Sequence, residues 1–182
     1  MLIALPAIFG LLILLLIIAA LQPNDCRYSR RAVVAAPAAA IFPHVNNLAR
    51  WRAWSPWEKM DPNMQRTFSG PAAGVGAIYA WDGNRHIGAG RMTLTESRAN
   101  EVIRFKLEFF RPFACTNRVE FSFIPEPGGT TVCWTMEGKN NFVGKLMGLF
   151  MNMDKMIGGQ FEEGLADLRR VSEKDAALEP AT

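Results

Sequence analysis

The sequence predicts an α+β fold in which a curved antiparallel sheet wraps around one long C-terminal helix. Between residues 64 and 138, apolar and polar residues alternate, and the turn-forming strings GPAAG, DGN, SRAN and PEPGG interrupt the alternation. From residue 142 to residue 171, apolar residues instead recur at helical spacing. Alternation indicates half-buried strands, whereas a helix with one apolar stripe must bury that stripe against another layer.

The N-terminal segment 2–21, LIALPAIFGLLILLLIIAAL, contains no charged side chain. Twenty helical residues span about 30 Å, the thickness of the hydrocarbon core of a bilayer. This predicts an uncleaved transmembrane helix within an anchor at residues 1–24. The alternative is a cleaved signal peptide, which the length of the run and the lack of a preceding basic residue disfavour.

The basic residues Arg27, Arg30 and Arg31 follow this segment, and none precedes it. The positive-inside rule therefore predicts a single-pass protein of the bacterial cytoplasmic membrane, with Met1 outside and the soluble domain on the cytoplasmic side. The net charge is only +3 and the charges are interspersed, so no nucleic-acid partner is expected. Three cysteines, an odd number, cannot form a complete disulfide framework, which agrees with a reducing compartment.

Residues 25–171 are long enough for one domain with a sizeable core, and the charged segment 172–182 is expected to be a flexible tail. A first strand is expected over residues 27–36, followed by two short helices within AAAIFPHVNNLARW. The four turn strings divide residues 64–138 into five strands, and about six to seven strands are expected in the whole sheet. A long helix follows at 142–171, capped by Asn140 or Asn141.

Three hairpin registers test this sheet. Across PEPGG, Pro125 pairs with Thr130. Across SRAN, the predicted pairing sets Leu94, Met92 and Gly90 opposite Ile103, Phe105 and Leu107. Across DGN, it sets Trp81, Tyr79 and Ala77 opposite His86, Gly88 and Gly90. Each register gathers the apolar residues on one face, and the opposite face carries Arg104, Lys106, Glu108, Glu120, Thr131 and Thr135. A slip of one residue would destroy this agreement. Cys133 then lies opposite Ser122, about 23 Å from Cys115, which excludes a disulfide between the two cysteines.

The apolar stripe of the last helix is expected to pack on the apolar face of the sheet. It comprises Val143, Leu146, Met147, Phe150, Met153, Ile157, Phe161, Leu165 and Leu168. Two inward glycines, Gly88 and Gly90, leave space on that face. Neighbouring side chains, a bend in the sheet or a ligand can fill it.

This order of elements resembles the helix-grip fold of the START-like (SRPBCC) superfamily. The strings WSPWEKMDPNM, SGPAAGVGAIYAWDGN, GAGRMTLTE and NMDKMIGGQFEEGLADL are similar to its polyketide cyclase/dehydrase-like branch, over residues 27–171. The resemblance implies a sheet curled around the long helix and an apolar cavity that accepts lipids, polyketides or other hydrophobic molecules. It implies no catalytic residue set for this chain.

Three tryptophans, Trp51, Trp54 and Trp57, lie close together in WRAWSPWE, where Pro56 stops a helix. Such a cluster either plugs the end of a core or forms the lip of an apolar site. In a helix-grip fold, Trp51 is the expected plug, and Trp54 and Trp57 are the expected lip.

No recognised catalytic motif occurs, and no metal-ligand spacing or cofactor motif is present. Asp154, Tyr79 and His86 are weak acid–base candidates. Asp154 lies on the apolar stripe of the last helix, where its alternative role is a structural pair with Arg, Tyr or Trp. The alternatives for His86 and Tyr79 are a rim position and core membership.

The favoured hypothesis is a membrane-tethered domain that binds a hydrophobic small molecule or lipid. The alternatives are a cyclase or dehydratase acting on a polyketide-like substrate, and an interaction domain without a ligand. The residues expected to contact a ligand are Trp54, Trp57, Tyr79, Trp81, Gly88, Gly90, Met92, Phe105, Leu107, Phe121, Trp134, Phe150 and Asp154.

Overall fold

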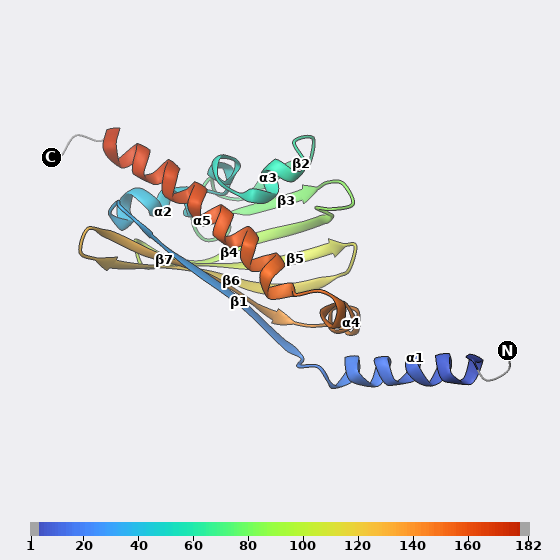
Figure 1. Ribbon diagram of the computed structural model, residues 1–182. Coiled ribbons are helices and arrows are strands. Elements are labelled where there is room, and N and C mark those ends of the chain that lie inside the picture. The colour runs from blue at the N-terminus through green and yellow to red at the C-terminus, as the bar shows by residue number, and fades with distance from the viewer. Residues whose placement is uncertain (1–3, 179–182) are drawn as a thin grey trace.

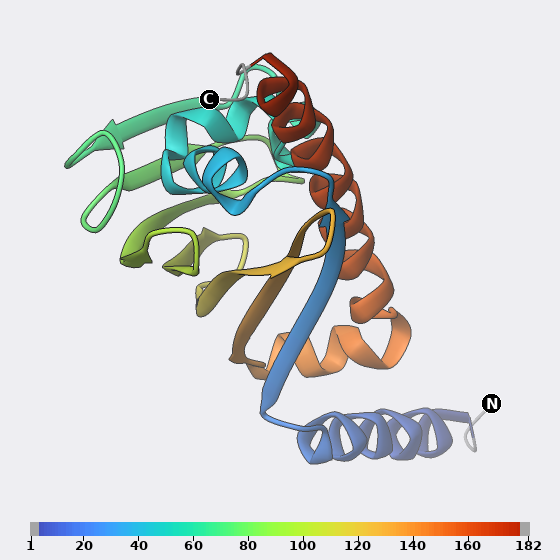
Figure 2. The same cartoon turned by 90° about the vertical axis from the view of Figure 1, so that its left-hand side faces the viewer.

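The computed structural model describes residues 4–178. Its central feature is a seven-stranded antiparallel sheet with the strand order β1-β7-β6-β5-β4-β3-β2. Figure 1 shows the long helix α5 lying across one face of this sheet, and Figure 2 shows the sheet curling around it. The predicted α+β architecture with a long C-terminal helix is therefore confirmed.

The strands are β1 (Asp25–Val34), β2 (Gln65–Ser69), β3 (Ile78–Asp82), β4 (Ala89–Arg98), β5 (Val102–Arg111), β6 (Cys115–Glu126) and β7 (Gly129–Lys139). The helices are α1 (Ala4–Leu21), α2 (Ala38–Asn46), the 3-10 helix η1 (Leu48–Ala53), α3 (Pro56–Met60), α4 (Phe142–Phe150) and α5 (Met153–Leu178). Strand β1 precedes the meander in sequence and pairs with β7, so the first strand lies beside the last.

The hairpin between β6 and β7 has the predicted register, with Pro125 opposite Thr130 and Phe121 opposite Trp134. The β4–β5 register differs from the prediction, because Leu94 pairs with Phe105 rather than Ile103. The turn is longer than SRAN suggested: Asn100 adopts a φ of 61°, and a bulge follows between Leu94 and Glu96. Together, the longer turn and the bulge shift the pairing by two residues, an even number, so the apolar residues remain on the inner face.

The β3–β4 connection also differs from the prediction, because residues 83–88 form a loop before β4 begins. Trp81 therefore pairs with Gly90 instead of His86, and Gly88 lies in the loop with a φ of 68°. A Cβ atom added at Gly90 would overlap the Trp81 ring. The predicted space beside Gly90 is thus filled by a neighbouring side chain, which is one of the alternatives considered.

Six strands, not five, lie between residues 64 and 139. The additional turn separates β5 from β6 at residues 112–114 and contains the cis peptide bond Arg111–Pro112. This turn has only one proline and no glycine, so its sequence carries only a weak turn signal. The total of seven strands agrees with the six to seven expected.

The predicted single helix over 142–171 is broken after Phe150. Met151 has extended backbone angles, and the side chain of Asn152 accepts a hydrogen bond of 2.9 Å from the backbone N–H of Lys155. Asn152 thereby caps a new helix. That helix, α5, continues to Leu178, so residues 172–178 of the expected tail are helical; residues 179–182 lie outside the described part.

The prediction of a membrane anchor is wrong: among residues 4–178, no helix is both long and apolar enough to cross a membrane. Helix α1 has 18 residues. One end of α1 instead contacts α4, where Lys145 Nζ donates a 3.2 Å hydrogen bond to the Ala20 carbonyl. Without a membrane-spanning helix among the described residues, the predicted localisation as a single-pass membrane protein is also wrong. The prediction that Met1 lies outside the membrane concerns a residue outside the described range.

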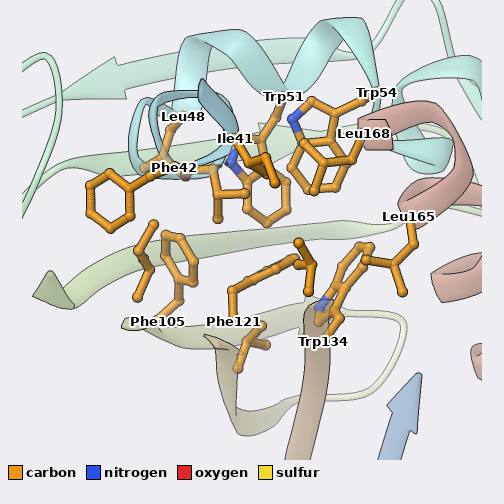
Figure 3. Packing of buried hydrophobic residues seen from close by; sticks show 14 of the residues in the cluster. Ile41, Phe42, Leu48, Trp51, Trp54, Phe105, Phe121, Trp134, Leu165 and Leu168 are labelled. Carbon is orange, nitrogen blue, oxygen red and sulfur yellow. Dashed lines mark hydrogen bonds between the residues drawn. The ribbon is translucent and has the colours of Figure 1, made fainter. Parts of the chain in front are cut away.

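The core contains a dense group of aromatic side chains between α2, η1, α5 and the inner face of the sheet, shown in Figure 3. Trp54, Phe105 and Phe121 are almost completely buried. The indole N–H groups of Trp51 and Trp54 donate to the carbonyls of Val45 and His44, at 3.0 and 3.1 Å. Both tryptophans therefore satisfy their polar atom inside the core, as buried indoles require.

Candidate functional site

A cavity of about 380 Å³ lies between the inner face of the sheet and the helices α3, α4 and α5. Most of its wall is apolar. The apolar and aromatic residues that line it are Trp51, Trp57, Met64, Tyr79, Trp81, Ile87, Met92, Leu107, Phe109, Pro112, Phe113, Val119, Trp134, Met136, Met147, Met153, Ile157 and Phe161. A volume of this size, enclosed mainly by apolar side chains, is typical of a site for a small hydrophobic molecule.

Three aromatic rings form the wall between the cavity and the packed core. The rings of Trp134 and Phe161 stack with centroids 4.3 Å apart and nearly parallel planes. The ring of Trp57 meets each of them edge-on, with centroid distances of 5.6 and 6.2 Å. Aromatic pairs in these geometries stabilise each other beyond simple burial. They form a rigid end to the cavity.

A buried polar network interrupts this apolar wall. Helix α3 places Glu58 at the cavity with only 9% of its surface exposed. The hydroxyl of Tyr79, on β3, donates a 2.5 Å hydrogen bond to Glu58 Oε1. On the other side of the carboxylate, Arg66 Nε on β2 donates a 2.7 Å hydrogen bond to Oε2. A buried carboxylate requires such partners, and Glu58 has two.

Arg66 is itself held by backbone oxygens. Its Nη1 donates to the carbonyl of Met64 at 2.6 Å, and its Nη2 lies 3.4 Å from the carbonyl of Asp61. Burial, followed by the hydrogen bond to Glu58, raises the pKa of Tyr79 far above its usual value. The phenol therefore remains neutral and keeps its proton directed at the carboxylate.

Two thiols also line the cavity, Cys26 from β1 and Cys115 from β6. Burial raises the pKa of both, so they are protonated near neutral pH. All three cysteines are free, which agrees with the predicted absence of a disulfide between Cys115 and Cys133. Within residues 4–178, no three His, Cys, Asp or Glu residues are grouped closely enough to hold a metal ion.

A second hollow, of about 590 Å³, lies outside the cavity between the start of β1 and α4. It is a more open groove with a more polar lining, which includes Asp25, Arg27 and Asn152. The cavity beneath α5 fits a small hydrophobic molecule better, because it removes such a molecule from water more completely.

The structure brings together six of the residues predicted to contact a ligand. Trp57, Tyr79, Trp81, Met92, Leu107 and Trp134 all line the cavity. The others do not. Trp54, predicted at the lip, is completely buried in the packed core, as are Phe105 and Phe121, while Gly90 lies beneath the Trp81 ring and Gly88 lies in a loop.

The remaining candidates lie away from the cavity. Phe150 is 71% exposed at the end of α4. Asp154 is exposed at the start of α5 and forms a salt bridge of 2.9 Å with Arg30, which lowers the pKa of Asp154. The structural pair of Asp154 with an arginine is the alternative considered above. His86 is exposed in the loop before β4.

Sequence reasoning made no prediction for Glu58, which the structure places at the cavity. The string SPWE, residues 55–58, matches a helix capping box, in which the glutamate bonds back to the residue that starts the helix. Here Ser55 makes no capping hydrogen bond with its side chain, and Glu58 binds Tyr79 and Arg66 instead. The capping-box pattern was the available signal, but it indicates a helix start rather than a cavity residue.

The chain is similar to known proteins in both sequence and structure. A family model described as "Polyketide cyclase / dehydrase and lipid transport" matches residues 25–173. A protein of Thermobifida fusca has a solution structure with a TM-score of 0.61 and 22% identity, over 84% of this chain and 95% of that one. A protein of Chromobacterium violaceum has a TM-score of 0.59 and 15% identity, over 84% and 99%.

The di-domain aromatase/cyclase StfQ of the steffimycin biosynthetic pathway is similar as well, with a TM-score of 0.61 and 10% identity. The match covers 85% of this chain and 52% of StfQ. At these identities the solved structures support the fold alone. No curated protein matches the chain. The family model, which covers most of the sequence, shows that the chain belongs to the polyketide cyclase/dehydrase and lipid transport family, as the START-like resemblance predicted.

Proposed function

We propose that this protein binds a hydrophobic small molecule in the cavity between α5 and the sheet. The observation that carries the proposal is the space of about 380 Å³ with a mainly apolar wall. Burying apolar ligand surface there stabilises a complex by about 25 cal/mol per Å² before the costs of association are subtracted. Family membership supports the same class of function.

Five methionines contribute to the cavity wall: Met64, Met92, Met136, Met147 and Met153. Their unbranched thioether side chains change rotamer at little cost, so the wall can adjust to ligands of different shape. The stacked rings of Trp134 and Phe161 contribute another part of the wall. This combination suits a site that accepts several related hydrophobic molecules.

The second candidate function is a cyclase-type enzyme, and one observation favours it. Glu58 and Tyr79 form a hydrogen-bonded acid–base pair at the cavity, which is an arrangement that proton transfer requires. We prefer binding because the Tyr79 proton is directed at Glu58 and the carboxylate is neutralised by Arg66.

The proposal can be tested with N-phenyl-1-naphthylamine, a probe whose fluorescence increases in apolar sites. The full chain is expected to bind one probe molecule. Leu107→Trp, which adds bulk to the cavity wall, should weaken binding at least tenfold. Phe110→Trp is the matched control, because Phe110 lies three residues further along β5, is absent from the cavity wall and is 52% exposed. Thermal unfolding of each variant checks that it is folded.

Equal probe affinity in the wild-type chain and in a folded Leu107→Trp variant would contradict binding in this cavity. Molecules that co-purify with the protein, identified by mass spectrometry after solvent extraction, would show the natural ligand. Incubating the protein with those molecules separates the two functions. Unchanged masses support binding, whereas steady loss of water from the ligand supports a cyclase or dehydratase.

A further inference from the structure

We infer that Glu58, together with Ser55, forms a hydroxyl-binding subsite in the cavity, so that the preferred ligand is a hydrophobic alcohol or phenol rather than a carboxylic acid or a hydrocarbon. The inference rests on the proposed function, because it names the class of ligand for the same cavity. It follows from which hydrogen-bonding groups in the Glu58 network remain available to a ligand.

The donors of this network are already engaged. Tyr79 has one hydroxyl proton, and that proton is donated to Glu58. Arg66 is not part of the cavity wall, and it donates to Glu58 and to backbone carbonyls. What Glu58 and Tyr79 present to the cavity are therefore oxygen lone pairs: two carboxylate oxygens have about four acceptor positions, of which two are used.

Ser55 adds a hydroxyl to the same part of the wall. It lies one helical turn before Glu58, lines the cavity, and is only 4% exposed. Its hydroxyl is not used to cap α3. A ligand hydroxyl can thus donate to the Glu58 carboxylate and accept from Ser55, a combination that neither a hydrocarbon nor a carboxylate provides.

Charge excludes the competing ligand classes. A ligand carboxylate would be buried beside the Glu58 carboxylate, where like charges repel in a medium of low dielectric constant. A ligand ammonium would add a positive charge to a carboxylate that Arg66 already pairs with at 2.7 Å. A neutral hydroxyl forms the hydrogen bond to a charged acceptor without either penalty.

The test compares three probes with the same aromatic skeleton: 2-naphthol, 2-methylnaphthalene and 2-naphthoate. Their dissociation constants are measured by isothermal titration calorimetry with the full chain at pH 7. We expect 2-naphthol to bind about tenfold more tightly than 2-methylnaphthalene, as expected for one hydrogen bond to a charged group. The carboxylate 2-naphthoate should bind most weakly.

Three variants locate the preference. Glu58→Gln should reduce the preference for 2-naphthol over 2-methylnaphthalene to about threefold or less, because a neutral amide is a weaker acceptor. Ser55→Ala should reduce it about threefold. Tyr79→Phe should retain the preference for 2-naphthol, because the Glu58 carboxylate remains and no longer accepts the hydrogen bond from Tyr79. Glu108→Gln is the matched control, since Glu108 is an ion-paired carboxylate on the outer face of the sheet.

The outcomes separate this inference from the proposed function. If neither 2-naphthol nor 2-methylnaphthalene binds, the proposed function fails and the inference fails with it. If both bind equally tightly, the cavity binds hydrophobic molecules and the hydroxyl subsite is wrong. Should Glu58→Gln fail to fold, the folded Ser55→Ala variant decides: an unchanged preference overturns the inference, and a reduced preference supports it.

Discussion

The two ends of the space beneath α5 are built from the same sheet face but differ in how that face is covered. At the end nearest α2 and η1, the helices insert large side chains, and Trp54, Phe121 and Leu168 are fully buried. At the end nearest α4, the covering helix has no buried residue, and the cavity occurs there. An apolar inner face therefore does not by itself decide whether a protein has a core or a cavity.

The break between α4 and α5 accounts for the difference. Along α5, Phe161, Leu165 and Leu168 continue one stripe that packs into the sheet. The stripe residues before the break belong to a separate short helix, whose Val143 and Phe150 are 36% and 71% exposed. Because α4 does not continue the axis of α5, it closes one side of the cavity instead of filling it.

The largest effect is expected from truncating an aromatic residue at the packed end. Trp54→Ala should lower the free energy of unfolding by about 3–5 kcal/mol, because it leaves a large void among rings that cannot collapse to fill it. Met147→Ala, at the hollow end, should cost less than about 1 kcal/mol. Urea denaturation measures both. Similar losses would show that the two ends are equally well packed.

A second comparison contrasts the buried and the exposed carboxylate. Glu58→Gln leaves the Arg66 charge without its partner and should destabilise the fold by about 3 kcal/mol. Asp154→Asn removes an exposed partner of Arg30, which keeps Glu162 as a second partner at 2.7 Å, and should change stability little. Chemical denaturation in parallel tests the contrast. A larger loss for Asp154→Asn would mean that the β1–α5 ion pair matters more than the cavity network.

Alkaline pH tests the Tyr79–Glu58 hydrogen bond. Burial and that bond raise the pKa of Tyr79 above its unfolded value of about 10, so Tyr79 stays protonated to a higher pH in the native state than in the unfolded state. Stability is therefore complete below pH 10 and declines as the pH rises, by about 1 kcal/mol between pH 9 and pH 11. Tyr79→Phe should flatten this decline in urea denaturation. An equally steep decline in the variant would assign it to other groups.

Acidic pH tests the packed end through His44, which is buried in α2. Burial lowers the pKa of His44 more than the nearby Asp175 raises it. The native state favours neutral imidazole, so stability is complete above pH 6.5 and falls as the pH decreases below that value. His44→Gln should reduce the slope between pH 7 and pH 5. His86→Gln, in an exposed loop, is the control and should leave the slope unchanged.

Much of the fold followed from the sequence because strand patterns are local. Alternation placed the apolar face correctly even where the β4–β5 and β3–β4 registers differed, since both shifts were even. The turn between β5 and β6 and the break at Asn152 were missed. Each depends on one or two residues whose pattern is weak, and tertiary contacts decide whether such a residue continues or ends an element.

The candidate site was less predictable than the fold. Trp57 and Tyr79 were expected at the cavity and line it, but Trp54, three residues before Trp57, is fully buried. Neighbouring tryptophans face opposite environments because η1 and α3 meet at Ser55 and change the direction of the chain. Glu58 was not predicted, since its partners Arg66 and Tyr79 come from two other elements.

The sequence alone determined the class of fold, the inner face of the sheet and the family, because period-two alternation and local strings are properties of consecutive residues. Only the tertiary structure decided where the inner face is filled and where it is hollow, and which carboxylate is buried. Glu58 follows a tryptophan in a loop-like string and Asp154 lies on an apolar stripe, yet the first is buried and the second exposed. The physical reason is that burial depends on which distant elements pack together: Glu58 meets Arg66 and Tyr79 from two other strands, whereas Asp154 pairs with Arg30 and stays exposed.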